Sequence, residues 1–187
     1  MPTTPLILLL SGSLRAGSSN ETVLRTAQAL AAEGAAPVRT QRYEGLGALP
    51  HFNPDEDTDP LPPPVAALRA AIAGASGVLV CTPEYAGSLP GSFKNLLDWT
   101  VGGTEICDKP VAWVNAAAPG RGGGAEAALR TVLGYTGAAI VEEACVRIPV
   151  AGEPLSPAGL LTAPTALTRL TAALTTLATA TTVPEGG

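Results

Sequence analysis

The sequence predicts an α/β fold in which a five-stranded parallel sheet is covered by helices on both faces. Short apolar segments alternate five times with segments of helical periodicity. The segments 6–10 and 77–81 are apolar without alternation, which is typical of strands buried on both faces. With 187 residues, of which 46% are hydrophobic, the chain is long enough for one core. We therefore expect a single domain over residues 1–187, with a frayed tail from residue 183.

The first apolar segment, residues 6–10, leads into a loop of Gly and Ser and then into a helix. Ser18 and Glu21 have the spacing of a capping box, so the helix should begin near Ser19 or Asn20. A helix start presents unpaired N–H groups to an anion, and Arg15 adds a full positive charge. The loop thus predicts a phosphate site. The alternative is that Ser18 is only a helix cap and Arg15 a solvated loop residue.

A family resemblance begins in this loop. Gly12, Ser13, Arg15, Ser18 and Asn20 resemble the G-S-x-R-x-x-S-x-N signature of the NAD(P)H-dependent FMN reductases, a flavodoxin-like family. The stretch 82–99 is similar to a second pattern of that family, P-E-Y-N-x-S-x-P-G-x-L-K-N-x-I-D-W. It matches at ten positions, namely Pro83, Glu84, Tyr85, Ser88, Pro90, Gly91, Lys94, Asn95, Asp98 and Trp99.

This resemblance implies a flavodoxin-like three-layer sandwich with strand order 2-1-3-4-5. In such a sheet the ligand lies at the carboxyl ends of strands one, three and four. By resemblance, the FMN phosphate would lie among Ser13, Arg15, Ser18, Ser19 and Asn20. The ring would contact Pro83, Glu84, Tyr85, Ala86 and Gly87, and its far edge would lie against Ala117, Gly120 and Gly122. For Trp99 we expect a core position instead.

The implied activity is electron transfer from NADPH or NADH, through bound FMN, to a small acceptor. A quinone, an azo compound, a metal oxyanion or free flavin would serve. No catalytic side chain is expected, because the flavin carries the chemistry. The resemblance also implies a homodimer or homotetramer, with residues 44–64 and the helix after Pro90 near the interface.

Two other functions stay open. One is a flavodoxin-like electron carrier that does not react with NAD(P)H itself. The other is a binding domain that has lost flavin, because Ala86 replaces the usual Asn, and Ala116 and Ala117 replace the usual serines.

A third glycine-rich stretch allows a different nucleotide site. Gly120, Gly122 and Ala125 fit the G-x-G-x-x-[GA] dinucleotide fingerprint, and Glu142 follows about 20 residues later. That fingerprint belongs to the first strand–helix unit, however, whereas this one lies in the fourth. It also follows its strand only after residues 116–119. We therefore expect residues 117–122 to form a ligand loop rather than a dinucleotide site.

The remaining helices and strands are predicted from hydrophobic periodicity and from proline and glycine residues that interrupt it. We expect a weak strand at 37–43, a functional or disordered loop at 44–64, and a helix at 65–73. A strand at 110–115 and a helix at 125–133 come next, and then a fifth strand made of 139–141 and 145–149. From Ser156 the leucine spacing predicts helix, with Pro164 setting the start of the main segment. Lys94 and Asp98 have the spacing of a surface ion pair.

Composition excludes several classes of function. The net charge is −5 and the basic residues are scattered, so we expect neither a nucleic-acid nor an anionic-membrane partner. No apolar run approaches the roughly 18 residues that a membrane helix needs, and we expect a cytoplasmic protein. The three cysteines and the single His51 lack metal-ligand spacing, so no metal site is expected.

Overall fold

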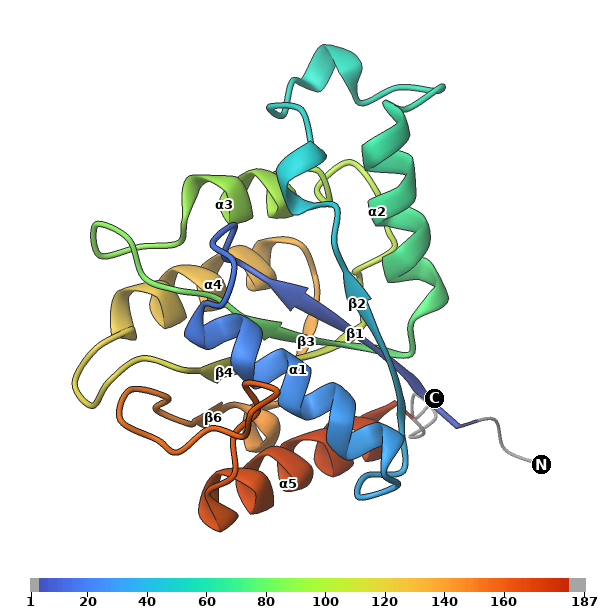
Figure 1. Ribbon diagram of the computed structural model, residues 1–187. Helices are drawn as coiled ribbons and strands as arrows, with labels where there is room; N and C mark the ends of the chain where they lie inside the picture. Colours follow the sequence, from blue (N-terminus) through green and yellow to red (C-terminus); the bar gives the residue numbers. More distant parts are fainter. Residues whose placement is uncertain (1–3, 182–187) are drawn as a thin grey trace.

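The structure, a computed structural model, describes residues 4–181, and the tail expected to fray lies outside these residues. Helices and strands alternate as predicted (Figure 1). The strands are β1 (Leu6–Ser11), β2 (Arg39–Tyr43), β3 (Gly77–Cys81), β4 (Pro110–Asn115), β5 (Ala139–Ile140) and β6 (Val146–Arg147). The helices are α1 (Ser19–Ala32), α2 (Pro63–Gly74), α3 (Gly91–Asp98), α4 (Gly123–Tyr135) and α5 (Pro164–Ala180).

The sheet is parallel and has the order β2-β1-β3-β4-β5, which confirms the predicted 2-1-3-4-5 topology. The predicted fifth strand consists of two short segments. β5 pairs with the beginning of β4 and β6 with its end, and the 3₁₀ turn Glu142–Ala144 separates them. The split lets the chain keep pairing with β4 while it bends at the two glutamates.

Helices cover both faces of the sheet. α1 and α5 pack on one face, and α2, α3 and α4 pack on the other (Figure 1). Successive residues of β1 alternate between the two cores: Ile7 and Leu9 face α1 and α5, whereas Leu8 and Leu10 face the other helices. This two-sided burial explains the uninterrupted apolar sequence of β1 and β3.

The sequence interpretation was wrong about one segment near the C-terminus. Residues 156–163, expected to turn helical, form a turn closed by a bridge between Leu155 and Leu161, and α5 begins at Pro164. Pro157 and Gly159 interrupt the helical pattern, and Gly159 has a φ of +73°. Proline and a left-handed glycine both disfavour a continuous helix, so leucine spacing alone misassigned this segment.

The long loop, residues 44–64, is held against the body of the protein. The Pro50 carbonyl accepts hydrogen bonds from Asn95 Nδ2 and Trp99 Nε1, both at 2.8 Å, and Phe52 N donates to Asn95 Oδ1 at 2.7 Å. Trp99 is fully buried, as predicted. The matched residues Asn95 and Trp99 therefore have an intrachain role in anchoring this loop.

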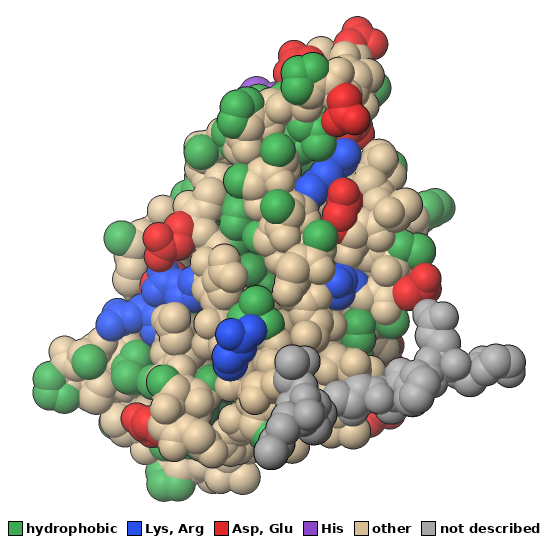
Figure 2. Space-filling model, turned by 90° about the vertical axis from the view of Figure 1, so that its right-hand side faces the viewer, with side chains coloured by type: hydrophobic (Ala, Val, Ile, Leu, Met, Phe, Trp, Pro, Cys, Tyr) green, Lys and Arg blue, Asp and Glu red, His purple; other side chains and the backbone are tan. Residues whose placement is uncertain are grey.

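The tip of the long loop is acidic. Asp55, Glu56 and Asp59 are exposed there, and Figure 2 shows red side chains gathered at the top of the molecule, near the purple histidine. His51 is exposed. The predicted Lys94–Asp98 pair is present at 2.5 Å. Among residues 4–181, no helix has the length and apolar character needed to cross a bilayer.

Candidate functional site

Three loops meet at the carboxyl edge of the sheet and line one cleft of about 330 Å³. The first loop, residues 12–18, follows β1; the second loop, 82–90, follows β3; the third loop, 116–122, follows β4. Ten of the predicted site residues line this cleft: Ser13, Arg15, Ser18, Ser19, Asn20, Pro83, Glu84, Tyr85, Ala117 and Gly122. The remaining three, Ala86, Gly87 and Gly120, lie in the same loops but do not line it.

The first loop presents polar groups at the start of α1. Ser18 Oγ accepts from Glu21 N at 3.2 Å, which confirms the predicted cap, and its hydroxyl hydrogen stays available as a donor. Glu21 pairs with Arg42 at 2.7 Å instead of reaching back to Ser18. The first intrahelical bond runs from Thr22 N to Ser18 O, so the N–H groups of Ser19 and Asn20 precede the helical ladder. This end of the cleft suits an anion.

Close packing holds the first and second loops together. Gly12 N donates to Cys81 O at 2.9 Å, and a Cβ on Gly12 would collide with Thr82. The buried Cys81 thiol donates to Asn20 Oδ1 at 3.3 Å, and burial raises the pKa of this thiol far above its usual value. Asn20 therefore reaches the cleft from a position fixed by β3.

The second loop turns sharply at Ala86 and Gly87. Tyr85 and Ser88 exchange two backbone hydrogen bonds of 3.0 Å, and both residues between them have positive φ, +50° at Ala86 and +74° at Gly87. Positive φ at both central residues is the mark of a type I′ turn, for which Asn-Gly is preferred. The usual family Asn therefore suits the backbone at this position. Tyr85 is 55% exposed at the mouth of the cleft.

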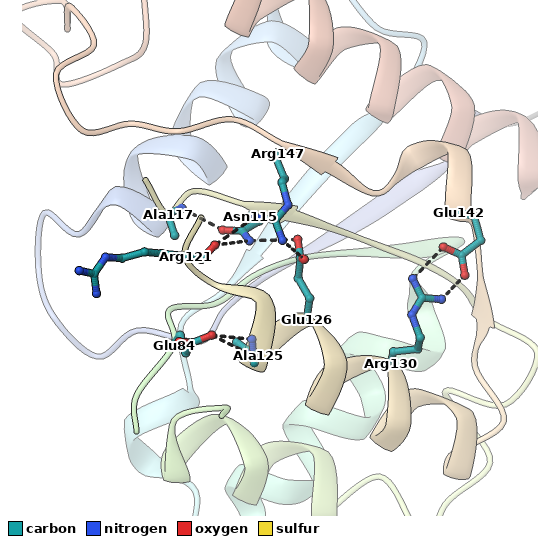
Figure 3. A network of polar contacts seen from close by, with 10 residues as sticks. Glu84, Asn115, Ala117, Arg121, Ala125, Glu126, Arg130, Glu142 and Arg147 are labelled. Carbon is teal, nitrogen blue, oxygen red and sulfur yellow. Dashed lines mark hydrogen bonds and ion pairs between the residues drawn. The ribbon is translucent and has the colours of Figure 1, made fainter. Parts of the chain in front are cut away.

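Glu84 links the second loop to α4 (Figure 3). Its Oε2 accepts from Gly124 N at 2.6 Å and from Ala125 N at 3.1 Å. A carboxylate at a helix N-terminus satisfies orphan N–H groups and opposes the positive end of the helix dipole. Glu84 lies in the cleft as predicted, but its carboxylate is directed to the protein backbone.

A buried amide organises the third loop. Asn115 Oδ1 accepts from Ala117 N at 2.9 Å, and its Nδ2 donates to Glu126 Oε1 at 3.0 Å and to Arg121 O at 3.3 Å. Arg147 of β6 pairs with Glu126 and donates to Arg121 O at 3.1 Å. Figure 3 shows the contacts of this network as dashed lines. Sequence reasoning missed Asn115 and Arg147; an Asn ending an apolar strand was the available signal for the first.

The glycine fingerprint has a local explanation. Gly122 caps α4 with a φ of +82°, and a Cβ there would lie 2.5 Å from Asn115 Nδ2. Glu142, the acidic residue expected of a dinucleotide site, instead pairs with Arg130, whose guanidinium lies 5.0 Å from the Trp113 ring centroid. This pairing lowers the pKa of Glu142. Gly122 and Glu142 thus have structural partners.

The residues present fit a flavin nucleotide. One end of the cleft carries helix N–H groups, serine hydroxyls and Arg15, as a phosphate requires, and the other has small or flat surfaces at Pro83, Tyr85 and 116–118. The lining contains no His, Lys or Cys. Among residues 4–181, no group of three or more His, Cys, Asp or Glu side chains is placed to hold a metal ion.

Comparisons with known proteins agree with this geometry. The profile of the NADPH-dependent FMN reductase family matches residues 5–153. The chain is 35% identical over 107 residues to a quinone reductase of Escherichia coli K12, covering 57% of this chain and 54% of that protein. It is 36% identical over 123 residues to an NAD(P)H-dependent FMN reductase of Pseudomonas aeruginosa, covering 65% and 64% respectively. The chain thus spans less than two thirds of the length of either relative.

A solved structure extends the similarity to 95% of this chain. The flavoenzyme NAD(P)H:(acceptor) oxidoreductase FerB from Paracoccus denitrificans superimposes with a TM-score of 0.80 at 28% identity, covering 95% of this chain and 97% of that one. The matched profile spans β1 to β6 and includes all three loops of the cleft. The chain belongs to the NADPH-dependent FMN reductase family.

Proposed function

We propose that the chain is an FMN-dependent NAD(P)H oxidoreductase that reduces a small acceptor of the quinone type. An azo compound, a metal oxyanion or free flavin is proposed as an alternative acceptor. The observation that carries this proposal is the convergence of three loops on one cleft whose two ends differ in chemistry. The names of the similar E. coli and P. aeruginosa proteins support it.

In this proposal the first loop and the start of α1 hold the FMN phosphate. Ser13 and Ser18 supply hydroxyl donors, Ser19 and Asn20 supply backbone N–H groups, and Arg15 supplies the charge. The Arg15 backbone is fixed because its N–H donates to Ser13 Oγ at 3.2 Å, while its exposed side chain stays available. A helix N-terminus and a guanidinium together select a dianion over a neutral group.

The second and third loops orient the flat part of the cofactor. In this proposal Pro83, Glu84 and Tyr85 contact one side of the ring, and Ala117 and Gly122 lie along its far edge. Ala86, Gly87 and Gly120 shape the same two loops without lining the cleft. When bound, FMN supplies hydride acceptance and electron transfer. Because Glu84 is committed to α4, the chain contributes binding, orientation and electrostatics rather than an acid or base.

Two broader properties belong to the same proposal. We propose that the protein works in the cytoplasm as a homodimer or homotetramer. The long loop and α3 are the proposed neighbours of the subunit interface, and the exposed Val101 just after α3 supports that placement.

An absorption spectrum between about 300 and 550 nm tests the proposal. Protein is loaded with FMN, desalted, and mixed anaerobically with NADPH or NADH; retained yellow colour that bleaches is the expected result. Retained colour that does not bleach would identify an electron carrier instead. Failure to retain FMN would identify a domain that has lost the cofactor, consistent with the substitutions Ala86, Ala116 and Ala117.

A further inference from the structure

The cleft contains one cation that the proposed FMN phosphate does not need. Three residues lining the cleft carry formal charge: Arg15, Glu84 and Arg121. The Glu84 carboxylate already accepts two hydrogen bonds from the start of α4. The cleft lining therefore has a net charge of +1 in a chain whose net charge is −5.

The backbone of Arg121 is fixed on both sides. Its N–H donates to Ala118 O at 3.0 Å, and its carbonyl accepts from Asn115 Nδ2 at 3.3 Å and Arg147 Nη1 at 3.1 Å. Because the Arg121 backbone is already ordered, binding a ligand costs only the conformational entropy of its side chain. The third loop thus presents Arg121 from a defined place.

The Arg121 guanidinium is not neutralised by the protein. No hydrogen bond or ion pair to it is found within residues 4–181. Glu126, the carboxylate of the network around Asn115, is already bound by Asn115 and Arg147. Figure 3 shows the Arg121 side chain extending away from that network, whereas Arg147 points into it. An exposed guanidinium in a cleft with no local counterion favours an anionic ligand.

We propose that Arg121 selects an oxyanion on the molecule that enters the cleft beside the flavin. This inference rests on the proposed function. Two substrates can carry such a group: the 2′-phosphate of NADPH, or a sulfonate, carboxylate or ionised hydroxyl on the acceptor. Arg121 comes from the third loop, after β4, whereas Arg15 comes from the first loop, after β1. In this proposal the two arginines address different groups.

Steady-state kinetics of FMN-loaded wild type and Arg121→Gln separates the two sources. One arm compares NADPH with NADH, and the other compares a neutral naphthoquinone with its sulfonated form. In Arg121→Gln, loss of the charge-assisted hydrogen bond should raise KM about tenfold for one anionic substrate, either NADPH or the sulfonated naphthoquinone. The substitution should leave kcat nearly unchanged, and likewise the KM of the matching substrate without that anionic group, NADH or the neutral naphthoquinone. Arg39→Gln, which changes an exposed arginine at the start of β2, at the opposite end of the parallel strands from the cleft, is the matched control.

A second readout does not depend on turnover. Titration calorimetry with 2′,5′-ADP and with a naphthalene sulfonate measures anion binding to FMN-treated protein, even if the wild type fails to oxidise NAD(P)H. If the wild type does not oxidise NAD(P)H, the proposed function is refuted. If Arg121→Gln nevertheless binds the anions more weakly than the wild type, the role of Arg121 in anion binding still holds. Equal KM values and equal anion affinities in the two proteins would overturn the inference. Loss of FMN from the variant would also overturn it, by placing Arg121 in the flavin site.

Discussion

The Glu84 carboxylate accepts a 2.6 Å hydrogen bond from the backbone N–H of Gly124, forty residues further along the chain. This contact joins the loop after β3 to the helix after β4. A Cβ on Gly124 would collide with the Gly87 carbonyl, so the same place also requires close backbone packing. Two walls of the cleft are therefore positioned by one side chain and one glycine.

Replacing Glu84 by Ala should lower the free energy of unfolding by about 1–2 kcal/mol, because two N–H groups of α4 lose their acceptor. Glu84→Gln keeps an acceptor but removes the charge, so its loss should be smaller. Urea unfolding checks this order, with the exposed Glu143→Gln as control. Equal stability of Glu84→Ala and wild type would contradict the capping role.

Removing the guanidinium in Arg15→Ala should weaken FMN binding by about 1–3 kcal/mol, through loss of a charge-assisted hydrogen bond to phosphate. Quenching of flavin fluorescence measures the dissociation constant. Arg39→Ala, an exposed arginine on β2, controls for the change in net charge. An unchanged dissociation constant for Arg15→Ala would exclude the phosphate assignment.

Alanine substitutions at the neighbouring residues Gly122 and Gly123 should affect stability differently. Gly122→Ala forces a left-handed alanine against Asn115 and should destabilise the protein by about 1–3 kcal/mol. Gly123→Ala meets no atom within 4 Å and lies at the start of α4, where alanine should be neutral or stabilising by up to about 1 kcal/mol. Thermal unfolding of both variants tests the contrast; similar shifts in Tm would disprove it.

Ala86 occupies a left-handed conformation that alanine adopts at a cost of about 1–2 kcal/mol. Ala86→Gly or Ala86→Asn should therefore raise the free energy of unfolding. The same change at Ala172, exposed within α5, should lower it by about 1 kcal/mol. Chemical denaturation of Ala86→Gly and Ala172→Gly should show shifts of opposite sign, and a decrease in both would refute the turn assignment.

The three thiols should react with iodoacetamide in the order Cys107, Cys145, Cys81. Cys107 is exposed, whereas burial raises the pKa of Cys145 to about 11, so about a thousandth of it is thiolate at pH 8. Alkylation of Cys145 should accelerate about tenfold per pH unit below that pKa. Peptide mapping by mass spectrometry follows each site. Labelling of the buried Cys81 before Cys107 would contradict the described burial.

Local sequence signals predicted most of the fold and the outline of the cleft. These signals act over a few residues and are therefore visible in the sequence itself. Examples are the apolar run of β1, the cap at Ser18 and the turn residues around Pro90. The rule that ligands bind at the carboxyl ends of strands then brought the three loops together.

The missed features depend on contacts between distant segments. Arg147 reaches Glu126 across 21 residues, and Glu84 reaches α4 across about 40, so no local pattern indicates either pairing. At position 86 the sequence analysis noted only that Ala replaces the usual Asn, whereas the positive φ adds the backbone preference of Asn for this turn. The turn at 156–163 escaped detection for a similar reason: leucine periodicity was given more weight than Pro157 and Gly159.

The anchoring of the long loop by α3 has a consequence for amide hydrogen exchange. Phe52 lies in an irregular segment where exchange is ordinarily fast, yet its N–H is bonded to the Asn95 side chain, and its ring packs edge-on against Trp99 at 5.0 Å. Exchange at Phe52 therefore requires the long loop to separate from α3. Because α3 continues directly from the second loop, we expect the chain around Phe52 and that wall of the cleft to open together.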